Sequence, residues 1–266
     1  MSPAPLSLGS PERAGLPSGD EKRAMVRQMF DDIAGHYDLL NRALSFGMDV
    51  GWRRRCISAL GLPKGSLILD VACGTGDLCD ELERQGLRPV GLDLSFGMLA
   101  QGRAKAFARA QRDHKAARVR PAKAQAPLVL ADALTGPFRT GSFDGVVSGF
   151  ALRNVVSLDA LFRELARITR PGGRISLLEL AEPEVPLLRA GHKLWCTYGV
   201  PFVGSLLSDA EAYKYLPRSL SYLPPAAEVV KSLESVGFAA VEHYLLAGGA
   251  SQLYVATRSQ GVAPWS

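Results

Sequence analysis

The stretch Leu67–Asp77, with the sequence LILDVACGTGD, decides how this chain folds. An apolar run of strand length ends in Asp70, and the turn Gly74-Thr75-Gly76 follows it closely. A second apolar run, Pro89–Leu92, ends in Asp93, which lies 19 residues after the first glycine. A buried strand, a tight glycine turn and a helix that points its N-terminal amides at a ligand form a site for a nucleotide-like cofactor. An acid about 20 residues further on is placed to meet a ribose.

Two cofactor classes fit this pattern. Dinucleotide binding favours G-x-G-x-x-G, but Cys79 stands at the third glycine position here. Asp77 in the first helical turn would repel a pyrophosphate, whereas a ligand with a cationic sulfonium and amino group would not be repelled. The D-x-x-x-G-x-G arrangement resembles motif I of S-adenosylmethionine-dependent class I methyltransferases. Two alternatives remain: an NAD-dependent oxidoreductase, and a glycine turn that only links strand to helix.

Length and composition describe an ordinary globular protein with one sizeable core. The chain has 266 residues, of which 47% are hydrophobic and 21% charged. No apolar run reaches the roughly 18–20 residues that span a bilayer, and the N-terminus lacks the pattern of a secretory signal. The four cysteines form no C-x-x-C pair and the four histidines no H-E-x-x-H motif. We therefore expect a cytoplasmic protein without a metal site or a disulfide framework.

The positive charge is concentrated in one segment. The whole chain carries +5, whereas residues 103–123 alone carry +7. Phe107 is the only aromatic residue in that segment, so the stacking platform that binds nucleic acid is missing. The pattern favours a basic insertion that is a solvated helix or loop, with no nucleic-acid partner. Attraction to anionic lipid headgroups is the functional alternative.

Strand and helix patterns alternate through the middle of the chain, which indicates an α/β fold with a mostly parallel sheet. Residues 1–19 are predicted to be a disordered leader, 20–258 a single domain and 259–266 a tail. Within the domain, 21–60 is helical in pattern and 183–222 is an apolar lid broken by proline and glycine. The remaining elements are expected as strands at 67–71, 88–92, 127–131, 143–150 and 174–180, helices at 77–85, from Ser95, from Ser157 to Arg170-Pro171-Gly172-Gly173 and at 226–236, and a terminal hairpin of 238–246 and 251–257. A final antiparallel hairpin on such a Rossmann-like sheet is the class I methyltransferase arrangement of seven strands with the last one reversed.

Each strand end offers a ligand group on one rim of the sheet, where open α/β sheets bind their ligands. Asp70 and Gly74-Thr75-Gly76 follow the first strand, and Asp93, which follows the second, is suited to both ribose hydroxyls. Asp132-Ala133 follow the third strand and suit the adenine amino group, and Gly149 on the fourth would lie under the methionine end. Any one acid also fits a helix N-cap, but three at successive strand ends favour one adenosyl site.

Several segments carry a more selective resemblance. The chain is similar to the ubiquinone/menaquinone biosynthesis C-methyltransferase family over about residues 25–258. The matching segments are Phe30–Asn41, Leu44–Met48, Trp52-Arg53, Leu152–Val155, Arg170–Arg174, Leu178–Leu180, Asp209–Leu216 and Ala247–Gly249. Two departures are a longer basic segment at 103–123 and Ala151 where the family often has glycine.

The resemblance implies a cofactor, a reaction and a set of residues. These enzymes transfer a methyl group from S-adenosylmethionine to a ring carbon of a prenylated quinol. Cofactor contacts of the family fall at Thr75, Asp93, Asp132-Ala133 and Gly149, although the family often has serine at the last of these positions. Arg153, with Tyr37 and Asp93, matches residues implicated in proton removal or substrate positioning.

The chemistry of the reaction suggests how these residues work. A ring carbon becomes nucleophilic when a neighbouring hydroxyl is deprotonated, so the enzyme must align the reactants and stabilise a phenolate. Arginine is a poor base, and we expect Arg153 to be the cation beside the oxyanion, with Asn154 orienting a hydroxyl or water. Tyr37 would cover the ring. The alternatives are a salt bridge from Arg153 to an acid of the lid and a packing role for Tyr37.

The acceptor is expected to be demethylmenaquinol, which the enzyme would convert to menaquinol. The Ala-, Arg- and Gly-rich composition hints at a high-GC bacterium, many of which use menaquinone. A polyprenyl methoxy-benzoquinol of ubiquinone synthesis and a non-catalytic quinone-binding relative remain alternatives. A lipid substrate implies peripheral contact with the membrane, and the family resemblance permits a homodimer. An apolar groove for the prenyl tail, or ordinary core packing, is predicted for Trp195, Tyr198, Pro201, Phe202, Val203, Leu206 and Leu207.

Overall fold

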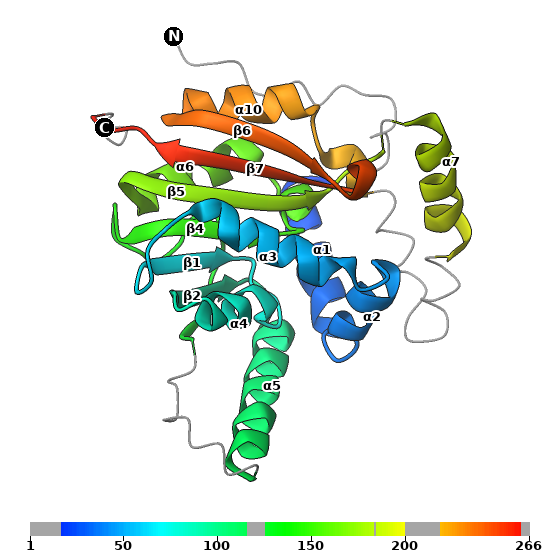
Figure 1. Cartoon of the computed structure of the whole chain (residues 1–266), viewed down its shortest axis with the longest axis horizontal. Coiled ribbons are helices and arrows are strands. Elements are labelled where there is room, and N and C mark those ends of the chain that lie inside the picture. Colours follow the sequence, from blue (N-terminus) through cyan, green and yellow to red (C-terminus); the bar gives the residue numbers. More distant parts are fainter. Residues whose placement is uncertain (1–16, 116–125, 184, 200–218, 262–266) are drawn as a thin grey trace.

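One seven-stranded sheet organises the molecule (Figure 1). The computed structural model describes residues 17–115, 126–183, 185–199 and 219–261. The strand order is β3-β2-β1-β4-β5-β7-β6, and β7 runs antiparallel to both of its neighbours while the other neighbouring pairs are parallel. The predicted seven-stranded sheet with one reversed strand is therefore confirmed. The strands are β1 (Leu67–Val71), β2 (Arg88–Asp93), β3 (Leu128–Leu130), β4 (Phe143–Gly149), β5 (Thr169–Leu180), β6 (Phe238–Leu246) and β7 (Ser251–Arg258).

Helices pack on both faces of the sheet. On one face, α6 and α10 bury Phe162, Leu165 and Leu233 against the strands. On the other, α3 and α4 bury Ile57, Leu60 and other apolar residues. The helices are α1 (Gly19–Ile33), α2 (Tyr37–Leu44), α3 (Met48–Leu60), α4 (Asp77–Arg84), α5 (Phe96–Lys115), α6 (Leu158–Ile168), α7 (Pro186–Leu194) and α10 (Ala226–Ser235), with short helical turns η2 (Leu152–Asn154), η3 (Trp195–Gly199), η4 (Leu220–Tyr222) and η5 (Ala247–Gly249).

Two local features differ from the sequence pattern. The helical region predicted at 21–60 is three helices, because the chain turns at 34–36 and again at 45–47, where Phe46 and Gly47 have φ of 51° and 76°. The segment Arg170–Gly173, expected to be a turn after α6, belongs to an irregular start of β5. The register with β4 shifts there, and Gly172 with φ of 76° supplies the left-handed residue that such a bulge uses.

The predicted lid is described in part. Residues 185–199 contain α7 and η3, and 219–222 contain η4, whereas 200–218 lie outside the described residues. The same holds for residues 1–16 of the predicted leader, 116–125 of the basic insertion and 262–266 of the tail. Among the helices that are described, none is both long and apolar enough to cross a lipid bilayer.

Candidate active site

A pocket lies at the carboxyl ends of β1, β2, β3 and β4. Helix α1 covers it, with Val26 and Phe30 facing the space. Parallel strands bring their C-terminal loops to the same rim, so residues far apart in sequence meet there. Seven predicted site residues line the pocket: Tyr37, Gly74, Asp93, Asp132, Ala133, Gly149 and Asn154. The other four predicted residues, Asp70, Thr75, Gly76 and Arg153, are not among its described lining residues.

Asp93 joins the loops after β1 and β2. Its carboxylate accepts hydrogen bonds from the backbone N–H of Gly74 and of Ser95, both at 2.8 Å. Burial raises the pKa of this carboxyl, and the two N–H donors oppose that effect by favouring the charged form. Each carboxylate oxygen has a further acceptor position. Asp93 is thus a fixed acceptor at the pocket wall, which suits a pair of ribose hydroxyls.

The turn after β1 has an unusual backbone. Ala72, Gly74 and Gly76 all have positive φ, at 54°, 55° and 83°. Glycine reaches this region without penalty, whereas alanine is strained there. The turn brings Ala72 and Gly74 to the pocket surface and starts α4 at Asp77. The glycine pair of the sequence motif is therefore explained by backbone conformation.

Asp132 and Ala133 form the wall after β3. Asp132 accepts a hydrogen bond from the Leu134 N–H at 2.9 Å, and its second carboxylate oxygen lies 3.1 Å from Nε of Arg23. Arg23 comes from α1, so the cover helix is tied to this loop. The Asp132 carboxylate thus lines the pocket while it contacts both the backbone of its own loop and Arg23.

The wall after β4 holds Gly149 and Asn154. A Cβ added at Gly149 would lie 3.1 Å from Cδ1 of Leu78, so glycine allows close packing of α4 beside the pocket. The Asn154 side chain donates to the Phe150 carbonyl at 3.2 Å. Phe150 has φ of 62°, and the turn it begins carries both Arg153 and Asn154.

Tyr37 lines the same pocket. It begins α2 and packs edge-on against Phe30 with ring centroids 5.9 Å apart. Burial raises the pKa of its phenol, while the nearby cations Arg53 and Arg153 act in the opposite direction. Tyr37 thus both packs against α1 and faces the pocket.

Arg153 is buried behind the pocket wall. Its guanidinium forms an ion pair with Glu179 on β5, donates to the Phe150 carbonyl at 3.0 Å and donates to Oγ of Ser219 at 3.1 Å. The sequence offered a salt bridge from Arg153 to an acid of the lid as an alternative. Arg153 does form a salt bridge, but its described partner Glu179 belongs to β5 and not to the lid. The sequence contained no signal for the choice of Glu179, because the pairing depends on the register of β4 with β5.

Asp70 is also buried outside the pocket. Its Oδ1 has no hydrogen-bond partner among the residues that the structure describes, and its Oδ2 accepts from the Cys79 thiol at 3.4 Å. Burial raises the pKa of this carboxyl to about 7, and the negative charge of Asp93 adds to the effect. Asp70 therefore contacts α4 through Cys79 and does not itself reach the pocket surface.

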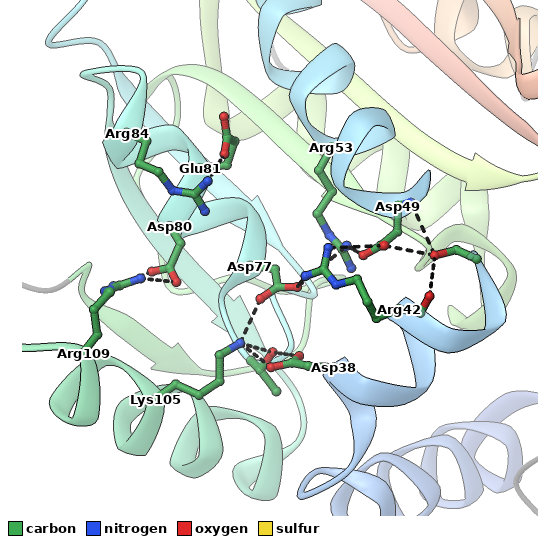
Figure 2. Close-up of polar contacts among 12 residues, drawn as sticks. Asp38, Arg42, Asp49, Arg53, Asp77, Asp80, Glu81, Arg84, Lys105 and Arg109 are labelled. Atoms are coloured by element: carbon green, nitrogen blue, oxygen red, sulfur yellow. Dashed lines mark hydrogen bonds and ion pairs between the residues drawn. The ribbon is translucent and has the colours of Figure 1, made fainter. Parts of the chain in front are cut away.

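Figure 2 shows an ionic network around Asp77, the first residue of α4. Asp77 lies 2.8 Å from Nζ of Lys105, 3.7 Å from Arg53 and 3.9 Å from Arg42. Although burial opposes ionisation of Asp77, the charges of Arg53 and Lys105 outweigh it and lower the pKa of the carboxyl. Asp77 therefore meets protein cations, whereas its sequence position suggested a cofactor cation.

The same network contains the hydrogen-bond partners of Thr75 and the ion-pair partners of Lys105 and Arg109, two cations of the basic segment. The Thr75 hydroxyl donates to Asp38 and accepts from Nζ of Lys105 at 3.0 Å. Arg109, one turn further along α5, pairs with Asp80 on α4 (Figure 2). Two cations of the basic segment are therefore bound to acids of the fold. The four-residue spacing of Lys105 and Arg109 was the available sequence signal for this helix contact.

Comparison with known proteins identifies the relationship. The profile of the ubiE/COQ5 methyltransferase family matches residues 18–258. The chain belongs to the ubiE/COQ5 methyltransferase family. It is 36% identical to a demethylmenaquinone methyltransferase of Roseiflexus castenholzii, over 90% of this chain and 95% of that protein. It is also 36% identical to a ubiquinone/menaquinone biosynthesis C-methyltransferase UbiE of Geotalea uraniireducens, over 88% of this chain and 97% of that protein.

Solved structures support the fold of this family member. Phosphoethanolamine N-methyltransferase 2 of Haemonchus contortus, in complex with S-adenosyl-L-methionine, superposes with a TM-score of 0.54 at 18% identity. The match covers 79% of this chain and 53% of that one. The sequence resemblance to the quinone C-methyltransferase family is thus confirmed by the family profile, and the class I methyltransferase fold by the structure.

Proposed function

We propose that this protein methylates a ring carbon of demethylmenaquinol with S-adenosylmethionine and so forms menaquinol. Membership of the ubiE/COQ5 methyltransferase family, together with relatives named as demethylmenaquinone methyltransferases, supports this function. The observation that supports it most directly is that Asp93 and Asn154 line one pocket, where we expect Asp93 to accept from the ribose and Asn154 to orient the ring hydroxyl.

The residues present fit the cofactor. Asp93 is held by two backbone N–H groups and keeps acceptor positions for the ribose, and Asp132 with Ala133 suits the adenine. Ala72 and Gly74 bring the backbone to the pocket surface, where it would contact the bound cofactor. When bound, S-adenosylmethionine supplies a methyl group already activated by its sulfonium.

The acceptor side requires a phenolate, an aligned ring and an apolar surrounding. Tyr37 is itself a phenol in this environment. Burial raises its pKa overall, while a hydrogen bond with Asn41 and the charges of Arg53 and Arg153 act against that rise. We expect the same cations to favour ionisation of the acceptor hydroxyl, with Asn154 orienting it. Arg153 would act from behind the wall, because Glu179 already binds its guanidinium.

An exposed apolar surface lies beside α2. The rings of Phe46 and Trp195 pack at a tilt of 39° with centroids 4.6 Å apart, and the Trp195 indole donates to the Leu44 carbonyl at 3.2 Å. The surrounding side chains of Leu39, Phe46, Met48, Leu194 and Tyr198 are exposed. This surface supports peripheral contact with a membrane that holds the prenylated substrate.

The rest of the predicted prenyl groove lies outside the described residues, namely Pro201, Phe202, Val203, Leu206 and Leu207. The homodimer stays a prediction, which sedimentation of the purified protein checks.

The test is incubation with methyl-labelled S-adenosylmethionine and demethylmenaquinol dispersed in detergent. We expect label in menaquinol, and much less label with Asp93→Asn at a cofactor concentration near the Kd of the unchanged protein. A folded protein that binds S-adenosylhomocysteine but leaves the quinol unlabelled contradicts the proposal. Preferential labelling of a polyprenyl methoxy-benzoquinol would assign it to ubiquinone synthesis.

A further inference from the structure

Lys22 is a buried lysine in the first turn of α1. It is 4% exposed, which is rare for lysine, because a buried ammonium must find hydrogen-bond partners. Its Nζ donates to the carbonyl of Arg153 at 2.9 Å and to that of Val155 at 2.8 Å. The ammonium also lies 3.5 Å from the centroid of the Tyr222 ring, a cation–π contact.

The two carbonyls that Lys22 binds flank Asn154. Asn154 and Val155 line the pocket, and the turn is also gripped from its other side, where Glu179 accepts from the Arg153 N–H at 3.2 Å. The side chain of Lys22 therefore fixes the backbone of the turn on which the predicted acceptor residues lie. The sequence resemblance did not assign Lys22 a role.

Helix α1 connects this turn with the cofactor loops. Asp31 accepts from Oγ of Ser95 at 2.6 Å and from the Gly97 N–H at 2.8 Å, beside the loop that holds Asp93. Arg23 binds Asp132 after β3. One helix is thus tied to the loops after β2, β3 and β4, and Lys22 makes the third of these links.

We propose that Lys22 is a positioning residue for methyl transfer. By binding the carbonyl groups of Arg153 and Val155, it holds Asn154 in place for the acceptor while α1 covers the methyl donor. This inference rests on the proposed function for its kinetic consequence. The positioning itself can be measured without activity, as the rate of hydrogen exchange in the turn at Arg153 and Asn154.

Lys22→Met keeps the chain length and helix propensity of the residue but removes its donors. In the full-length protein, the N–H of Asn154 binds the Ala151 carbonyl at 2.8 Å, so its hydrogen exchange reports the turn. We expect exchange at Arg153 and Asn154 to become about tenfold faster in Lys22→Met. Tyr222→Leu, which removes the ring and the hydrogen bond of its hydroxyl to the Pro17 carbonyl but keeps both carbonyl contacts of Lys22, is expected to give a smaller acceleration. Gln28→Met, an exposed change on the same helix, is the matched control.

Comparing kcat with the Kd for S-adenosylmethionine distinguishes a positioning role of Lys22 from a role in cofactor binding. With saturating substrates, kcat of Lys22→Met is expected to fall about tenfold, whereas the Kd for S-adenosylmethionine stays within twofold of the unchanged protein. Unchanged exchange at the turn overturns the proposal. So does equal acceleration at Leu161 on α6, because that would mark general destabilisation. If the unchanged protein fails to methylate the quinol but the turn still depends on Lys22, the proposed function is wrong and the positioning stands.

Discussion

Arg153 and Glu179 form a buried ion pair behind the wall of the pocket. The guanidinium pairs with one carboxylate oxygen, and the Arg153 backbone N–H donates to the other at 3.2 Å. Glu179 is fully buried and Arg153 is 5% exposed. The pair locks the turn after β4 to the end of β5, so its integrity and the shape of the pocket are coupled.

Removing one partner of this pair should destabilise the protein strongly. Glu179→Gln leaves the Arg153 cation buried without its carboxylate, and we expect a loss of about 3–5 kcal/mol in the free energy of unfolding. Urea unfolding measures it. Asp20→Asn, which removes an exposed ion pair with Arg23, should cost less than about 1 kcal/mol. A loss below about 1 kcal/mol for Glu179→Gln would contradict a structural role for the pair.

Asp93→Asn should weaken cofactor binding. The amide retains the shape of the side chain, but it loses charge and turns an NH₂ group toward one of the two N–H donors at Gly74 and Ser95. We expect the Kd for S-adenosylmethionine to rise about 10- to 100-fold, the range for a lost charge-assisted hydrogen bond. Isothermal titration calorimetry measures it. Asp80→Asn, which breaks a pair with Arg109 away from the pocket, is the control and should bind as the unchanged protein does.

Asp70 should make stability fall as the pH rises. Burial raises its pKa to about 7 in the folded protein, whereas the unfolded value is about 3.9. Between these values the folded state holds a proton that the unfolded state has lost, so unfolding becomes easier with rising pH and this effect levels off above about pH 7. Asp70→Asn should flatten the dependence, with a larger gain in stability at pH 8 than at pH 5. Urea midpoints at both pH values test this, and parallel curves for the two proteins would refute it.

Two substitutions in the turn after β1 should have opposite signs. Ala72→Gly relieves a left-handed alanine and should stabilise the fold by roughly 0.5–1 kcal/mol, after the greater freedom of glycine in the unfolded chain is counted. Gly76→Ala places a Cβ at φ of 83° and should cost about 1–2 kcal/mol. Thermal and urea unfolding of both variants measure these changes. Effects of the same sign would show that neighbouring contacts, and not backbone strain, control the turn.

The local pattern predicted most of the sheet. β1 spans the expected residues, and β2 and β4 differ from expectation by one residue at their ends. Buried parallel strands are continuous apolar runs bounded by turn residues, so their signal is local. The start of β5 could not be predicted in this way, because Pro171 and Gly172 normally end an element. The register with β4 decides that a bulge forms there.

The site was predictable to the extent that it lies at strand ends. Asp93, Asp132 and Gly149 each follow or end a parallel strand, and topology brings them to one rim. The ion-pair partners of Arg153 and Asp77 were harder to predict, because Glu179 and Lys105 lie 26 and 28 residues away from them in the sequence. Lys22 had no signal at all, because its partners are backbone carbonyls more than 130 residues away.

The sequence by itself determined where most of the strands lie, the glycine turn and the acids that follow the strands. These depend on hydrophobic runs and turn chemistry that are complete within a few residues. Only the tertiary structure decided which charges meet. It pairs Arg153 with Glu179 and Asp77 with Lys105, and it ties Lys22 to the turn around Asn154. The physical reason is that buried charges and donors must find partners, and the packing of helices on the sheet determines which partners are within reach.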